Sequence, residues 1–521
     1  MDDFNGFLED ETRKYRRHFK AVRLAEWDAY ALGTDEASAA FEQRQNECDA
    51  AYADAGSYKA VLQRLQSPAA DPADRRQLEL LRLEYLRCRG DQELQRRIRA
   101  AEASLIQKFN TFRAAVDGQM LTDNDAREVL TESRDGNELQ ATWEASKQQG
   151  ALVERDVLEI VRMRNAYARG LGFANYHDFA LEIQEQTSEE VIAVFDELHE
   201  RTRELYAQVK KDIDARLTRL YDVPESGLRP WHYQNPFFQE APHVFGGDLD
   251  AHYARDAIDL VGRFYASVGL PIDDLLSHSD LFERKGKSQH AFCNDIDREG
   301  DVRVLCNMRN NAYWTSVLLH ESGHGVYWKC MDPALPYLLR TDAHTLVTEA
   351  VAILFGNLCV DLGFIRFAGA TIDDALERTV REQRRAERLV FEKWSQVMVR
   401  FERELYANPD QDLNARWWSL VKEYQGIDYS RDAPDWASKI HLATAPAYYH
   451  NYQLGHMLAE QLRHAMAQSG IGELAGSPAV GQFLKNRLFD LGKRYRWDET
   501  VERAIGERLT PRHWATAVNA L

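Results

Sequence analysis

Helical periodicity runs through almost the whole chain, and it limits the possible folds more than any other feature. In residues 75–116, the apolar positions Leu78, Leu81, Leu83, Tyr85 and Leu86 lie among arginines and glutamates. This is the pattern of an amphipathic helix. Similar patterns cover the ranges 5–30, 36–66, 124–148, 151–170, 188–222, 250–268, 312–330, 345–363, 373–407, 412–424, 449–469 and 478–493. The sequence therefore predicts a mostly α-helical protein.

Strand patterns are rare by comparison. The best is the run VRVLC at 302–306, which we expect to pair with residues near 290–292 across the polar turn 295–301. The 521 residues contain no internal repeat and no low-complexity tract. We therefore expect one domain, 1–521. Subdomains are expected within it, because a single core stops growing near ~250–300 residues.

Composition excludes several classes of function. The net charge of −18 disfavours binding to nucleic acids and to anionic lipids. No apolar run approaches the roughly 20 residues that a membrane helix needs. Residues 1–20 are charged throughout and contain no apolar segment, so we expect no signal peptide and a cytoplasmic location. The six cysteines form no CxxC pair, which fits reduced thiols in that compartment.

The run HESGH at 320–324 predicts a metal site. His320 and His324 stand four positions apart in a helical pattern, so both imidazoles face one side of the helix. Glu321 lies beside that face, where it can accept a proton from a metal-bound water. A surface helix with two unrelated histidines is the alternative. The apolar residues 317–319 directly before His320 argue against it, because they predict a buried helix.

A third ligand is expected at Glu349. It is a lone carboxylate in the apolar run 345–355, 25 positions after His324. A buried carboxylate without a cation is unfavourable, and a zinc ion would remove that penalty. A salt bridge to an arginine or lysine is the alternative. Two histidines and one glutamate leave the fourth zinc position for water, as in catalytic sites rather than closed structural ones.

The segment 439–456 is rich in groups that can donate hydrogen bonds to a developing oxyanion. It holds a lysine, several histidines and several tyrosines around Pro446, at the expected start of a helix. We select His441 and Tyr452 as the donors. Ordinary aromatic packing is the alternative for all of these residues, and we favour it for Tyr448.

The chain resembles the angiotensin-converting-enzyme-like dipeptidyl carboxypeptidases, and the resemblance extends over most of its length. The matching motifs, in order, are RN at 164–165, AR at 168–169, GF at 172–173, HA at 290–291, HESGH at 320–324, WW at 417–418, YQG at 424–426, KIH at 439–441 and YxxY at 449–452. One departure is Ile353, which stands where the family commonly has an aspartate.

The resemblance implies a role for each matching residue. Glu321 would be the general base and later the general acid, and His441 and Tyr452 would stabilise the oxyanion. Lys439 and Tyr449 would hold the C-terminal carboxylate of the substrate, and Gln234 is a weaker candidate for the same task. His290 and the backbone of Ala291 would pair with an extended substrate chain. A solvated surface position is the alternative for Lys439.

Together these features predict a large helical zinc peptidase with a deep central cleft between two subdomains and a small β element near the zinc helix. Residues 1–120 would form a lid, and 121–521 the catalytic body. The substrate would be a short peptide that loses its C-terminal dipeptide when a zinc-bound water attacks. The alternatives are a thimet-oligopeptidase-like endopeptidase, a metallocarboxypeptidase that releases single residues, and a catalytically silent peptide-binding protein.

Overall fold

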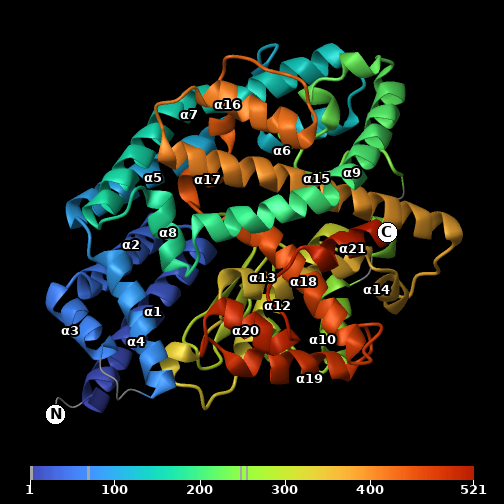
Figure 1. Ribbon diagram of the computed structural model, residues 1–521. Helices are drawn as coiled ribbons and strands as arrows, with labels where there is room; N and C mark the ends of the chain where they lie inside the picture. Colours follow the sequence, from blue (N-terminus) through green and yellow to red (C-terminus); the bar gives the residue numbers. More distant parts are fainter. Residues whose placement is uncertain (1–3, 67–70, 247–248, 254–255) are drawn as a thin grey trace. The chain divides into compact units, whose positions relative to one another are not determined.

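The computed structural model describes residues 4–66, 71–246, 249–253 and 256–521. Most of these residues lie in helices (Figure 1), and two small antiparallel hairpins accompany them. The predicted mostly α-helical fold with a small β element is therefore confirmed. None of the described helices is long and apolar enough to cross a membrane.

The chain divides into two compact units. The first comprises Met1–Arg89, Asp248–Glu377 and Leu454–Trp514. Its helices are α1 (Phe4–Leu32), α2 (Asp35–Tyr52), α3 (Ala55–Leu65), α4 (Pro72–Cys88), α10 (Ala257–Ser267), α11 (Asp273–His278), α12 (Ala312–Lys329), α13 (Thr345–Gly356), α14 (Leu362–Phe367), α19 (Pro478–Arg487), α20 (Trp497–Ile505) and most of α18 (His450–Gln468). The cleft expected between two subdomains stays a prediction.

The predicted β element lies in this first unit. Strand β4 (Val302–Leu305) pairs antiparallel with β3 (Phe292–Asp295), and Phe292 stands opposite Leu305. The prediction for 302–306 is thus confirmed, and its partner begins at the end of the range expected for it. Strand β3 packs against α12, the helix that carries the HESGH motif.

Helix α1 is attached to the same hairpin. Lys20 forms an ion pair of 3.0 Å with Asp297, and Arg298 donates a 2.9 Å hydrogen bond to the hydroxyl of Tyr15. A core cluster joins Leu8 of α1 to buried residues of α2, α3 and α4 and to Leu338. The N-terminal helices of this unit are therefore packed against the element that lies next to α12.

The second unit comprises Gly90–Gly247, Arg378–Gln453 and Ala515–Leu521. Its elements are α5 (Gln92–Thr111), β1 (Ala114–Val116), β2 (Gln119–Leu121), α6 (Asp123–Glu132), α7 (Gly136–Gly170), α8 (Tyr176–Ile183), α9 (Ser188–Tyr221), α16 (Leu413–Leu420), α17 (His441–Thr444) and most of α15 (Asp374–Ala407). The unit boundary falls inside α15, α18 and α21 (Arg512–Ala520).

Helix α7 corrects the sequence-based expectation of two helices, 124–148 and 151–170. It continues through Gly150, and the break comes earlier, where Asp135 caps α7 by accepting from the amide of Asn137. A Cβ at Gly150 would lie 2.2 Å from the carbonyl oxygen of Pro434. This glycine therefore permits close packing inside a helix and does not end it.

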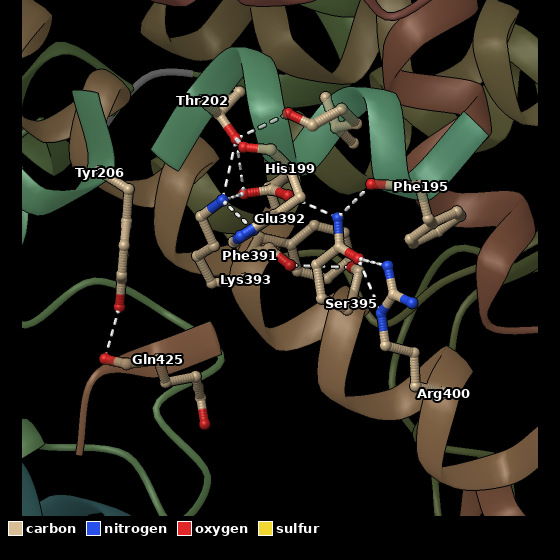
Figure 2. A network of polar contacts seen from close by, with 12 residues as sticks. Phe195, His199, Thr202, Tyr206, Phe391, Glu392, Lys393, Ser395, Arg400 and Gln425 are labelled. Atoms are coloured by element: carbon tan, nitrogen blue, oxygen red, sulfur yellow. Dashed lines mark hydrogen bonds and ion pairs between the residues drawn. The ribbon is translucent and has the colours of Figure 1, made fainter. Parts of the chain in front are cut away.

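Buried polar contacts join α9 to α15 (Figure 2). Glu392 and Lys393 are both fully buried on α15, 2.8 Å apart, and Lys393 also donates to the hydroxyl of Thr202 at 2.9 Å. One turn further, the side-chain amide of Gln396 donates to the carbonyl of Phe195 at 2.8 Å. Buried polar groups that are paired in this way fix two helices in one arrangement.

Candidate metal centre and substrate-binding residues

Helices α12 and α13 bring the three predicted metal ligands together. His320 and His324 lie one turn apart on α12, and Glu349 lies on α13. One ligand atom from each residue lies within 4.8 Å of the other two. Nε2 of His320 is 3.6 Å from Oε2 of Glu349. The three side chains thus surround a space that one metal ion can occupy.

Two glycines allow this close approach. A Cβ at Gly323 would lie 2.7 Å from Cα of Ala352 on α13, a distance that real Cβ atoms essentially never show. A Cβ at Gly455 of α18 would likewise lie 3.0 Å from the Cβ of Glu349. The glycine within the HESGH motif therefore lets the helix carrying the histidines lie directly against the helix carrying Glu349.

The donor set fits zinc. Burial lowers the pKa of His320 to about 4, and burial also holds the pKa of His324 well below its usual range. Both imidazoles are therefore neutral donors at pH 7. Nδ1 of His324 lies 2.8 Å from the hydroxyl of Thr348, which leaves Nε2 for the metal. Two imidazole nitrogens and a carboxylate oxygen are typical ligands of catalytic zinc.

Glu321 is buried beside the triad. Burial and the nearby charge of Glu349 raise the pKa of Glu321 to about 8, while the backbone amide of Cys293 opposes that rise. A bound dication would favour the ionised form. The carboxyl group predicted to act as a base is therefore close enough to the metal site for the charges there to change its pKa.

His290 and Ala291 directly precede strand β3 in the same unit. The side chain of His290 is exposed, and its backbone amide donates a 3.2 Å hydrogen bond to the hydroxyl of Ser288. Cys293, further along the strand, faces α12, because its sulfur would lie 3.5 Å from a Cβ at Gly325. The predicted substrate-pairing segment is therefore an extension of the strand that contacts the metal helix.

The other predicted site residues belong to the second unit, where they gather around Lys439. This lysine is only 9% exposed. Its Nζ lies 5.5, 5.3 and 5.5 Å from the ring centroids of Phe237, Trp394 and Tyr449. Burial lowers the pKa of Lys439 to about 8. Lys439 is therefore not the solvated surface residue that the sequence left open as an alternative.

The hydrogen-bond partner of Lys439 is Gln239, a residue that the sequence analysis missed. Nζ of Lys439 donates to Oε1 of Gln239 at 2.6 Å. The side chain of Gln234 forms its hydrogen bonds with other residues: it accepts from the amide of His243 at 2.7 Å and donates to the hydroxyl of Tyr221 at 3.3 Å. The two glutamines stand five positions apart in one loop, so the sequence alone offered no basis for choosing between them.

His441, Tyr449 and Tyr452 form an aromatic group next to this lysine. The ring centroids of His441 and Tyr449 are 5.3 Å apart, and those of Tyr449 and Tyr452 are 5.4 Å apart. The indole of Trp394 on α15 donates to the hydroxyl of Tyr449 at 2.6 Å, which fixes that ring. The structure therefore brings Lys439, Tyr449, His441 and Tyr452 together in one cluster, with Gln239 in place of Gln234.

Comparison with known protein families gives two matches. Residues 2–233 match the family model described as angiotensin-converting enzyme, and residues 277–520 match that of peptidase family M3. None of the curated proteins matches the chain. The second match contains the metal triad together with Lys439, His441, Tyr449 and Tyr452, whereas Gln239 lies between the two matches. Peptidases of both families depend on zinc, in agreement with the donor set of the triad.

Proposed function

Since the chain is a zinc metallopeptidase similar to angiotensin-converting enzyme, we propose that it shortens peptides by releasing dipeptides from their C-terminal end. The observation that carries this proposal is the environment of Lys439. Among the described residues, no carboxylate lies within ion-pairing distance of its ammonium group, and only Gln239 accepts a hydrogen bond from it. A buried cation without a counter-ion favours binding of an anion.

The C-terminal carboxylate of a peptide suits this environment. It supplies the missing charge and can accept hydrogen bonds from both Lys439 and the amide group of Gln239. The hydroxyl of Tyr449 already accepts from Trp394, so its own proton is free to point toward such a carboxylate. The aromatic rings around Lys439 exclude water and thereby strengthen a charge-assisted bond.

The reaction would divide between the two groups of residues. A bound zinc ion supplies Lewis acidity, which lowers the pKa of water and polarises the scissile carbonyl. His320, His324 and Glu349 would hold that ion. Glu321 would take the proton from the attacking water and pass it to the leaving amine, as a general base and then a general acid.

Stabilisation of the oxyanion would come from His441 and Tyr452. Both can donate a hydrogen bond, and the rings of Tyr449 and Tyr452 touch, so the oxyanion donor and the carboxylate anchor are held as one group. An anchor at a fixed distance from the reacting carbonyl determines which bond is cut. The resemblance to dipeptidyl carboxypeptidases suggests that this bond lies two residues from the end.

The first unit offers room for the rest of the peptide. A cavity of about 370 Å³ is lined by Tyr15 and Phe19 of α1, Cys48 of α2, Cys293 of β3 and Trp328 of α12. The ring of Trp328 stacks on that of His324, at 5.8 Å between centroids. This supports a role for the N-terminal helices as a lid over the segment of peptide that precedes the scissile bond, with His290 and Ala291 pairing with the peptide backbone.

One observation favours a second candidate function. The match to peptidase family M3 includes the metal triad, and it supports an oligopeptidase that cuts inside short peptides. Product masses separate the two functions. Incubation of one peptide in free-acid form should give its C-terminal dipeptide as the first product. Internal fragments would favour the endopeptidase, and single amino acids would favour a metallocarboxypeptidase. A protein that binds the peptide without cleaving it would be a silent binder.

A further inference from the structure

The chain between His441 and Tyr452 makes an unusual turn. Helix α17 ends at Thr444, and α18 begins at His450. Between them, Ala447 adopts a φ of +51°, in the left-handed region that is unfavourable for a residue with a Cβ. Ala447 is also fully buried. A strained backbone of this kind persists only where the surrounding structure holds it.

Two side chains from other helices hold this residue on both sides. The amide of Ala447 donates to Oε1 of Glu402 on α15 at 2.8 Å. The carbonyl of Ala447 accepts from the side-chain amide of Gln184, at the end of α8, at 2.9 Å. Gln184 also accepts a 2.9 Å hydrogen bond from the side chain of Asn451, in the first turn of α18. The turn and the start of the next helix are thus joined to one glutamine.

The acceptor for the Ala447 amide, Glu402, is a buried carboxyl group. Its side chain is buried, and burial raises the pKa of its carboxyl group to about 7, against the opposing effects of the Ala447 amide and of Arg164. Arg164 itself donates to the carbonyl of Ala443, in the helix that begins at His441, at 2.5 Å. A buried carboxyl group is unfavourable for stability unless it is well paired, so a purely structural turn does not require one.

The geometry assigns Glu402 and Gln184 as positioning residues, which hold the turn at Ala447 so that Tyr449 and Tyr452 are placed correctly with respect to His441. This inference rests on the proposed function, in which Tyr449 anchors the substrate and Tyr452 and His441 act at the oxyanion. This turn lies between His441 and the two tyrosines in the chain, so its backbone conformation sets the positions of the tyrosines relative to His441. A change in its backbone would therefore move the donors and the anchor together.

The test compares Glu402→Leu with Glu402→Gln in the zinc-loaded enzyme. Leucine has no acceptor for the Ala447 amide, whereas glutamine keeps one. We expect kcat to fall by about 10- to 100-fold in Glu402→Leu, since a displacement of about 1 Å in a catalytic group has effects of this order. Glu402→Gln should restore most of the lost activity. Gln184→Leu, at a less buried position, should show a similar loss of kcat. If Glu402→Leu does not fold, Gln184→Leu alone tests the positioning role.

Two further variants separate positioning from stability. Gln396→Leu removes a buried hydrogen bond from the same helix to Phe195 (Figure 2), outside the turn, so it should lower the melting temperature without lowering kcat. Ala447→Gly removes the Cβ that strains the turn. Combined with Glu402→Leu, it should recover part of the lost kcat, because glycine adopts a positive φ without help.

The inference is overturned if folded Glu402→Leu and Gln184→Leu keep the wild-type kcat. It is also overturned if Gln396→Leu loses as much kcat as they do. Zinc content is measured for each variant. A lower zinc content would mean that the loss of kcat comes from the metal centre, and this result would also overturn the inference. The bond that the wild-type enzyme cuts is read from product masses and tests the proposed function separately. The variants are compared on that bond, whichever it is.

Discussion

Replacing Lys439 with methionine should abolish the preference of the enzyme for peptides with a free C-terminal carboxylate. Methionine has a similar length and is apolar, so it can fill the space between Phe237, Trp394 and Tyr449 without leaving a buried charge. We expect kcat/KM for a free-acid peptide to fall, and kcat/KM for the same peptide with an amidated C-terminus to change little. The substitution removes a buried ammonium whose hydrogen-bond acceptor among the described residues is Gln239 and not a carboxylate.

The size of the effect follows from the surroundings of that ammonium group. A hydrogen bond that involves a charged group contributes roughly 1.5–3 kcal/mol. At about 1.4 kcal/mol per factor of ten, this corresponds to about 10- to 150-fold in kcat/KM. The upper part of this range is expected, because Lys439 is 9% exposed and aromatic rings surround it. The wild-type enzyme should discriminate between acid and amide by the same factor.

The assay measures both peptides with wild-type enzyme, with Lys439→Met and with a matched control. Lys422→Met is that control, because Lys422 is exposed in the same unit and pairs with Asp428 at 2.8 Å. It should leave both rates unchanged. Equal losses on acid and amide in Lys439→Met would refute the reasoning, since they would show that Lys439 supports the fold or the chemistry rather than the carboxylate.

Four further outcomes are expected. Glu321→Gln should retain zinc and lose about 100-fold or more in kcat, because an amide cannot accept the proton of water; a normal kcat would assign the base elsewhere. Glu349→Ala should lower the zinc content of the purified protein, and full occupancy would remove Glu349 from the ligand set. Thr348→Val should weaken zinc binding by about 10- to 100-fold, measured by chelator competition. Because burial lowers the pKa of Lys439 to about 8, kcat/KM for free-acid peptides should fall above that pH as the ammonium loses its proton. Lys439→Arg should move that fall to higher pH, and an unchanged profile would contradict the assignment.

Much of the metal centre could be predicted from the sequence because its determinants are local. The spacing of His320 and His324 places both on one helix face wherever the helix lies. Glu349 was recognisable as a lone carboxylate in an apolar run, although only the structure shows that it reaches the two histidines. The strand at 302–306 was equally local, since its alternating pattern is read directly from its residues.

The residues around Lys439 were harder to predict because they come from distant segments. Gln239 lies 200 positions before Lys439 and carries no motif that distinguishes it from Gln234. Trp394 fixes Tyr449 from the middle of a long helix, where a tryptophan is expected to be only a core residue. These roles arise from tertiary packing, for which hydrophobic periodicity contains no signal.

Short elements were missed for a different reason. Strands β1 and β2 have three residues each, too few for an alternating pattern to stand out. The signal that would have revealed them is the pair Asp117-Gly118, because both residues have positive φ and join two strands in a tight hairpin. The helix boundary expected between residues 148 and 151 was also wrong, because α7 continues through Gly150.

The most direct test of the account is the identity of the first product released from a defined linear peptide. Zinc-loaded enzyme is incubated with the free-acid peptide, and products are identified by mass at low conversion, with Glu321→Gln as the blank. The account predicts the C-terminal dipeptide and the peptide shortened by two residues, and little of either from the amidated peptide. Cleavage at internal bonds, or equal rates on acid and amide, would contradict it.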